Sequence, residues 1–138
     1  MTERVLARIA DTSIDVAEVE DFVAGREHGA VVTFRGVVRD HDGGETVTAL
    51  DYQGHPDAEE FLRRVCTAVA AESGLPVAAV HRVGALTIGD VALAASVAAP
   101  HRAEAFAACQ ALVDRIKVEV PIWKKQHYDG RASDWVGL

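Results

Sequence analysis

Hydrophobic and polar residues alternate along some stretches of the chain and recur every three to four residues along others, which predicts a mixture of strands and helices. Segments that alternate or are rich in β-branched residues, as strands are, span residues 4–10, 29–39, 47–52, 77–83 and 91–98. Segments with apolar residues three to four apart, as in amphipathic helices, span residues 15–24, 57–73 and about 100–118. We expect residues 121–138 to be mostly extended or looped, with Trp135 and Val136 as anchors.

Capping residues mark the ends of the three predicted helices. Ser13 or Asp15 is suited to cap the first helix, and Gly25 is suited to end it. Gly74 follows the second helix, where a glycine often takes the left-handed conformation that ends a helix. Pro100 suits the first turn of the third helix, because a backbone N–H is not needed there.

Turn-forming residues organise the predicted strands. The polar stretch 40–46 contains glycine and predicts a loop between strands 29–39 and 47–52. We expect these two strands to form a long hairpin with a bulge at Gly36. A turn around Gly89 separates the next two strands. Helices mixed with adjacent strand pairs predict an α+β fold.

Length and composition indicate one globular domain over residues 1–138. A domain usually has roughly 100–200 residues, and the hydrophobic fraction of 49% excludes a disordered chain. No apolar run approaches the about 20 residues that cross a bilayer, and the N-terminal sequence lacks the pattern of a secretion signal. The two cysteines, Cys66 and Cys109, make no disulfide framework. We therefore expect a cytoplasmic protein that does not bind membranes.

Charge is unevenly distributed along the chain. The formal net charge is -7, but residues 101–138 contain 6 of the 14 basic residues and only 5 of the 21 acidic ones. All three lysines, Lys117, Lys124 and Lys125, lie in this stretch. An acidic protein with one basic cluster is not expected to bind nucleic acid, which requires a broad basic face. The cluster fits a site for a small anion, unless it reflects chance in the composition.

The third predicted helix carries candidate site residues at both ends. His101 and Arg102 begin it, where the backbone N–H groups favour an anion, although both residues also fit a solvated helix end. Lys117 closes the helix, and its simplest role is to interact with the helix dipole. Alternatively, Ile122 and Trp123 exclude water from this amine, which makes a lysine usable as a nucleophile or acid–base group.

Other candidates carry weaker signals. Arg35 and Arg39 lie four apart on a predicted strand, so they share a face and either bind an anion or contact solvent. His81 near the end of a strand is more typical of a core or surface residue than of a catalyst. No metal-ligand spacing such as H-E-x-x-H is present. Cys66 and Cys109 lie on apolar helix faces, which favours core positions over nucleophiles.

Three long motifs and a late tryptophan cover most of the chain from Gly29 onwards. They are GAVVTFRGVVRDHD (29–42), HRVGALTIGD (81–90), APHRAEAFAACQALVDRIKVEVPIWKK (99–125) and Trp135. In this order they resemble the large, catalytic subunit of molybdopterin synthase, the MoaE family. The resemblance implies an α/β hammerhead-like fold with an antiparallel sheet and two longer helices. It also implies a cofactor-free sulfurtransferase that inserts two sulfur atoms into cyclic pyranopterin monophosphate to form the dithiolene of molybdopterin.

The resemblance also implies partners. In this family, sulfur arrives as a thiocarboxylate on the C-terminal Gly-Gly of a small ubiquitin-like carrier subunit. Two catalytic subunits form a homodimer at the core of a heterotetramer, with one carrier at each end. We therefore expect two protein partners, a second copy of this chain and a sulfur carrier.

Position by position, the resemblance implies six site residues. Lys117 matches the family's essential lysine, and Lys124 matches its second active-site lysine. The substrate-binding positions are Arg39, His101, Arg102 and the pocket wall residue Phe34. Family members often carry a further basic residue a few positions beyond the late tryptophan. None follows Trp135 in this sequence, and Arg131 is a candidate to replace it.

Helix geometry adds an expectation that does not depend on the family. His101 and Lys117 are 16 residues apart on one predicted helix, so roughly 24 Å separates them at 1.5 Å per residue. One pterin-sized ligand cannot contact both ends of such a helix. If both residues serve one site, that site lies at a twofold interface and receives His101 and Arg102 from the second copy.

Two other functions stay open from the sequence. The chain fits a regulatory domain that binds a small anion or nucleotide in the same basic pocket. It also fits a cysteine-dependent sulfurtransferase in which Cys109 or Cys66 carries a persulfide.

Overall fold

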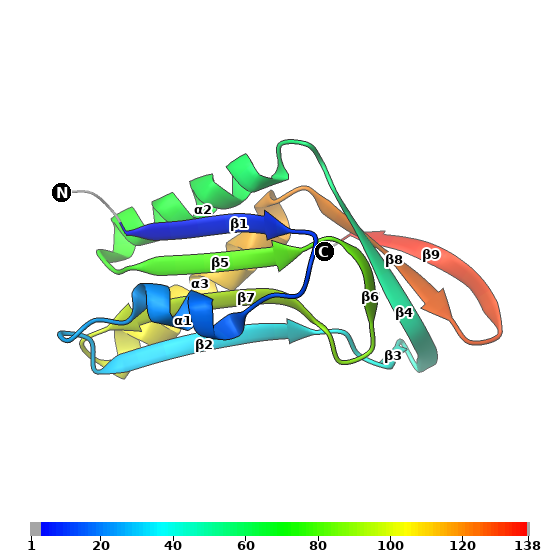
Figure 1. The fold of residues 1–138 in the computed structure, drawn as a ribbon, viewed down its shortest axis with the longest axis horizontal. Helices are drawn as coiled ribbons and strands as arrows, with labels where there is room; N and C mark the ends of the chain where they lie inside the picture. Colours follow the sequence, from blue (N-terminus) through cyan, green and yellow to red (C-terminus); the bar gives the residue numbers. More distant parts are fainter. Residues whose placement is uncertain (1–3, 138) are drawn as a thin grey trace.

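The computed structural model describes residues 4–137 and shows an α+β fold over that range (Figure 1). Its helices are α1 (Val16–Val23), α2 (Ala58–Ser73) and α3 (Arg102–Glu119). Its strands are β1 (Val5–Ala10), β2 (Ala30–Val37), β3 (His41–Asp42), β4 (Glu45–Gly54), β5 (Val77–Arg82), β6 (Gly84–Thr87), β7 (Val91–Ala99), β8 (Ile122–Tyr128) and β9 (Arg131–Gly137). The prediction of an α+β fold with an antiparallel sheet and two longer helices is confirmed.

The first sheet has the strand order β1-β5-β7-β2 and is covered by helices on both faces. Strands β1 and β5 run parallel, whereas the other pairs are antiparallel. Val77 and Ala79 of β5 pack into the core beneath α2 and α3, and Ala78 and Val80 pack beneath α1 (Figure 1). A strand that is buried on both faces needs a continuous apolar run, as β5 has.

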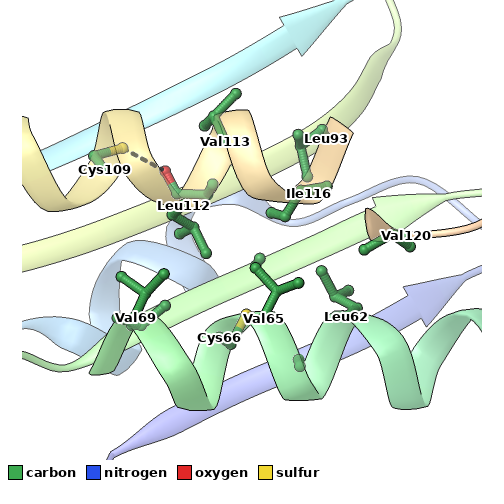
Figure 2. Packing of buried hydrophobic residues seen from close by; sticks show 14 of the residues in the cluster. Leu62, Val65, Cys66, Val69, Leu93, Cys109, Leu112, Val113, Ile116 and Val120 are labelled. Atoms are coloured by element: carbon green, nitrogen blue, oxygen red, sulfur yellow. Dashed lines mark hydrogen bonds between the residues drawn. The ribbon is translucent and has the colours of Figure 1, made fainter. Parts of the chain in front are cut away.

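The larger core lies between the first sheet and helices α2 and α3 (Figure 2). Leu62 and Val65 of α2 approach Leu112 and Ile116 of α3, and none of the four is more than 1% exposed. The two residues of α2 are three positions apart and the two of α3 are four apart, so within each helix the two side chains fall on one face. Burial of each such side chain contributes roughly 1.5–3 kcal/mol to stability.

Both cysteines lie in this core, as predicted. Cys66 is 0% exposed and Cys109 is 3% exposed. The Cys109 thiol donates a weak hydrogen bond to the backbone carbonyl of Ala95 at 3.8 Å (Figure 2). Burial raises the pKa of Cys66 to about 12 and also raises the pKa of Cys109. Both groups are therefore thiols rather than reactive thiolates in the folded chain.

The second sheet has the order β3-β4-β8-β9, and β6 pairs with β4 beside this path. The predicted hairpin between residues 29–39 and 47–52 is wrong. Strand β2 pairs with β7 in the first sheet, whereas β4 pairs with β6 and β8 in the second. The predicted bulge at Gly36 is confirmed as a register shift between Gly36 and Val37, after which the chain leaves the first sheet. Alternation identifies a strand but does not select its neighbour.

Residues 40–46 form a tight hairpin rather than a loop. His41 and Asp42 pair with the first residues of β4. Gly43 and Gly44 make the turn with φ values of 58° and 82°, which favour glycine. The sequence pattern also does not predict β6, which follows β5 after a single residue and pairs with β4.

The ends of the helices follow the predicted caps except at two positions: the C-cap of α1 is Ala24, one residue before Gly25, and Pro100 lies outside α3. Asp15, not Ser13, caps α1 by accepting hydrogen bonds from two backbone N–H groups of the first turn. Gly74 ends α2 in the left-handed conformation, with φ 73°. Helix α3 begins at Arg102, so Pro100 precedes the helix instead of occupying its first turn. No helix in the described residues is long and apolar enough to cross a bilayer.

The C-terminal segment forms the β8–β9 hairpin, which is more regular than predicted. Trp135 is 56% exposed, so its predicted role as a buried anchor is wrong. Its ring instead lies beside the Lys125 ammonium group, 5.7 Å from the nitrogen. Val136 is only partly buried.

Candidate active site

A pocket with a volume of about 350 Å³ lies between the first sheet, the end of α3 and the second sheet. Strands β2, β4, β5, β7 and β8 all contribute to its lining. Four of the six predicted site residues line it, namely Phe34, Arg39, Lys117 and Lys124. These residues lie far apart in the sequence, and the crossing of the chain between the two sheets brings them together.

Arg39 lies just beyond the bulge that ends β2. Because β2 ends at Val37, Arg35 and Arg39 do not share one continuous strand face, and that part of the prediction is wrong. Both arginines still line the pocket. The Arg39 guanidinium lies 3.7 Å from the Asp42 carboxylate and is 66% exposed, so this weak surface pair leaves it able to bind an anion.

The two candidate lysines reach the pocket from different elements. Lys117 lies in the last turn of α3 and is exposed. Lys124 lies on β8 and is partly buried. Of the two residues expected to exclude water from Lys117, Ile122 is buried but Trp123 is 45% exposed. Lys124 is thus more shielded from water than Lys117.

Lys124 has the electrostatic surroundings of an acid–base group. Its pKa is lowered, first by burial and then by the positive charges of Lys117 and Arg39, while Asp42 opposes the shift. Both burial and neighbouring cations disfavour the protonated amine. A lysine in such surroundings releases its proton more readily than a solvated one, which suits proton transfer.

His81 also lines the pocket, although the sequence favoured a core or surface position for it. Its side chain is buried, and Nδ1 lies 2.8 Å from the backbone carbonyl oxygen of Arg82. The Tyr52 ring contacts it edge-on, with ring centroids 5.1 Å apart. Burial, assisted by the charge of Lys117, lowers the pKa of His81 to about 4, so the ring is neutral. A polar residue after the apolar run of β5 was the one sequence signal for this position.

His101 and Arg102 do not line this pocket. His101 is the N-cap of α3 and Arg102 is its first residue, whereas Lys117 lies in the last turn of the same uninterrupted helix. Both side chains are exposed, and His101 makes no capping hydrogen bond with its side chain. The structure therefore separates these two predicted substrate-binding residues from the other four within one chain.

Arg131 does not replace the missing basic residue near the pocket. Its guanidinium donates to Glu45 at 2.6 Å and to Asp134 at 2.9 Å, and it stacks over the Tyr128 ring at 3.7 Å. These contacts hold the side chain in the hairpin, and it is not part of the pocket lining. The idea that Arg131 belongs to the site is wrong for the single chain.

The pocket is suited to bind an anionic molecule and to transfer protons. Arg39, Lys117 and Lys124 supply positive charge, and Phe34 supplies an apolar wall. Neither cysteine lines it. Among residues 4–137, no group of three or more His, Cys, Asp or Glu side chains is arranged to hold a metal ion.

Comparison with known families shows which family the chain belongs to. The family described as MoaE protein matches residues 9–119. The chain belongs to the MoaE family. This confirms the resemblance drawn from the sequence motifs, and the match includes five of the six predicted site residues, since Lys124 lies just beyond it.

Individual relatives of this MoaE-family chain agree. Molybdopterin synthase catalytic subunit 1 of Mycobacterium tuberculosis is 40% identical over 134 residues, covering 94% of this chain and 89% of the relative. The molybdopterin synthase catalytic subunit of a Nostoc species is 35% identical and covers 91% and 78%. The crystal structure of molybdopterin synthase from Staphylococcus aureus superposes with a TM-score of 0.89 at 34% identity, covering 96% and 97%.

A more distant structural relative shares only the fold. It is a chain in a complex of subunits 1 and 2 of the molybdopterin-converting factor of Helicobacter pylori. It superposes with a TM-score of 0.70 at 17% identity and covers 92% of this chain and 90% of its own length. The two-sheet architecture of the MoaE family is thus retained at low sequence identity.

Proposed function

We propose that this chain is the catalytic subunit of a molybdopterin synthase, a sulfurtransferase of molybdenum cofactor biosynthesis. The observation that carries the proposal is the pocket in which Arg39, Lys117 and Lys124 of a MoaE-family chain come together. The substrate is cyclic pyranopterin monophosphate, and each of the two sulfurs comes from the C-terminal thiocarboxylate of a small ubiquitin-like carrier. The chain acts as one domain, residues 1–138, in the cytoplasm.

The pocket residues divide between binding and chemistry. Arg39 binds the cyclic phosphate, because a guanidinium can donate two parallel hydrogen bonds to phosphate oxygens. Phe34 forms an apolar wall for the pterin. Lys117 and Lys124 polarise the thiocarboxylate and move protons during sulfur transfer. The lowered pKa of Lys124 supports its role in proton transfer.

The site is completed by a second copy of the chain. His101 and Arg102 lie at the far end of α3 from Lys117, so they reach a substrate only from the partner of a homodimer. The surface of β2 and α3 supports such a contact. It exposes Phe106, which is 61% exposed and lines an apolar groove between the two elements. The dimer forms the core of a heterotetramer with one carrier at each end.

Reconstitution with purified components tests the proposal. The protein, a thiocarboxylated carrier and cyclic pyranopterin monophosphate are mixed, and molybdopterin is measured. We expect product from the intact chain and a loss of about 100-fold or more in Lys117→Ala and Lys124→Ala, the range of acid–base and electrostatic contributions. Lys125→Ala is the matched control, since it removes the same charge from a neighbouring position that does not line the pocket.

The same assay separates the two other functions. A cysteine-dependent sulfurtransferase would lose activity in Cys109→Ala or Cys66→Ala and keep it in Lys117→Ala. A purely anion-binding domain would give no product with the intact chain. The burial of both thiols favours retention of activity in the cysteine variants.

A further inference from the structure

His81 is the one histidine that lines the pocket while its side chain is buried. It lies near the end of β5, paired with Leu93 of β7 and Ile9 of β1 in the middle of the first sheet. Only 2% of the residue is exposed, and it lines the pocket together with Lys117 and Lys124. Its position is therefore fixed by the sheet and not by a mobile loop.

The hydrogen bond of one ring nitrogen determines the character of the other. The carbonyl oxygen of Arg82 only accepts hydrogen bonds, so Nδ1, at 2.8 Å, carries the proton. Nε2 has no hydrogen-bond partner among residues 4–137. Two side-chain atoms of that range are fully buried and have no hydrogen-bond partner, namely His28 Nδ1 and Arg82 Nε. His81 Nε2 is not one of them, so it is not fully buried. Nε2 is therefore an unprotonated acceptor on a ring that lines the pocket.

The surroundings keep this ring neutral. Lys117, Lys124 and Arg39 place positive charge in the pocket, and Asp42 is the carboxylate that lines it. Asp42 also lies 3.7 Å from the Arg39 guanidinium. Lysine and arginine side chains only donate hydrogen bonds. His81 thus supplies what the cations cannot, a neutral acceptor at a fixed position beside the Tyr52 ring.

We propose that Nε2 of His81 accepts a hydrogen bond from an N–H or O–H group of the substrate's ring system. The cations then bind the phosphate, and His81 selects the uncharged part of the molecule by its donor group. A substrate that lacks this donor leaves a buried acceptor unpaired, which costs affinity. This inference rests on the proposed function, because it takes a pterin phosphate as the occupant of the pocket.

Two variants of His81 separate the two ring nitrogens. His81→Asn keeps a donor near the Arg82 carbonyl and loses the acceptor, whereas His81→Gln extends a carbonyl oxygen towards the place of Nε2. Binding of cyclic pyranopterin monophosphate is measured by calorimetry, with inorganic phosphate as a probe of the cations alone. We expect His81→Asn to weaken pterin binding about tenfold and His81→Gln to stay within about threefold of the wild type. Phosphate binding should be unchanged in both variants.

A measurement on the unaltered protein protects the test against a variant that fails to fold. In protein labelled with 15N, the resonance of an unprotonated Nε2 moves upfield when the atom accepts a hydrogen bond. We expect this movement on addition of the pterin and none on addition of phosphate. Wild-type pterin binding by His81→Asn, equal weakening in both variants, or an unmoved Nε2 resonance overturns the inference while the proposed function stands. Failure of the wild type to bind the pterin overturns both.

Discussion

Burial lowers the pKa of Lys124, and the ammonium group of Lys117 lowers it further across the pocket, although the two lysines belong to different secondary-structure elements. Helix α3 ends at its C-cap Val120, whose N–H donates to Ile116, and the chain then enters β8. The alternation of β8 places Ile122, Lys124 and Gln126 on one face, where Ile122 is buried and both Lys124 and Gln126 line the pocket. The turn between α3 and β8 therefore creates the electrostatic coupling.

This coupling predicts that Lys117→Gln raises the pKa of Lys124. The substitution removes a like charge and keeps a side chain of similar length, so the protonated amine of Lys124 becomes less unfavourable. The titration is followed by NMR of the labelled lysine side chains. Lys125→Gln is the control, and we expect it to change the pKa of Lys124 less. An unchanged or lower pKa in Lys117→Gln would show that Lys117 does not contribute to the shift.

A site shared between two copies predicts restored activity in mixed dimers. Lys117→Ala and His101→Ala are each expected to be inactive alone. In a mixed dimer, one site carries both defects and the other site carries neither. Random mixing of subunits then restores up to about a quarter of wild-type activity. Synthesis of molybdopterin after joint refolding checks this, and complete inactivity of a verified mixed dimer would contradict the shared site.

Burial of the two thiols predicts slow alkylation of the folded protein. The pKa of Cys66 is raised to about 12 and that of Cys109 is also raised, so little thiolate exists at pH 8. We expect iodoacetamide to modify both residues about 100-fold or more slowly than in denaturant. Mass spectrometry of timed samples measures the rates. Rapid labelling of Cys109 under native conditions would reopen the cysteine-dependent mechanism.

The low pKa of His81 predicts a loss of stability in mild acid. Its pKa falls from the ordinary 6.5 to about 4 in the folded chain, so the unfolded chain binds a proton that the folded chain does not, and stability decreases as pH falls through this window. The shift corresponds to about 3 kcal/mol. Asp40 and Asp90, whose pKa values are lowered below 3.8, lose their contributions only at lower pH.

Urea unfolding between pH 7 and pH 4 measures this loss, and His81→Gln is the matched variant because it does not titrate. We expect the difference in unfolding free energy between wild type and variant to change by about 3 kcal/mol over this range, to the disadvantage of the wild type at low pH. Parallel pH dependences for the two proteins would show that His81 is not held neutral by the fold.

Local features of the sequence determined the type and order of most elements. The apolar period of α2 and the glycine that ends it depend on neighbours within a few residues, and so does the cap at Asp15. The bulge at Gly36 likewise depends on a local feature, a glycine inside a strand. The proposed roles of Lys117 and Lys124 also come from the sequence, because the long motif around them resembles one family over many positions.

Tertiary structure alone decided which strands are neighbours and which side chains share the pocket. The pairing of β2 with β7 joins segments about 60 residues apart and is not encoded in the alternation of either strand. His81 became a pocket residue, and Lys124 rather than Lys117 became the partly buried lysine, because of how the two sheets meet at the end of α3. Burial and electrostatic coupling depend on distances across the fold, and a linear sequence does not contain those distances.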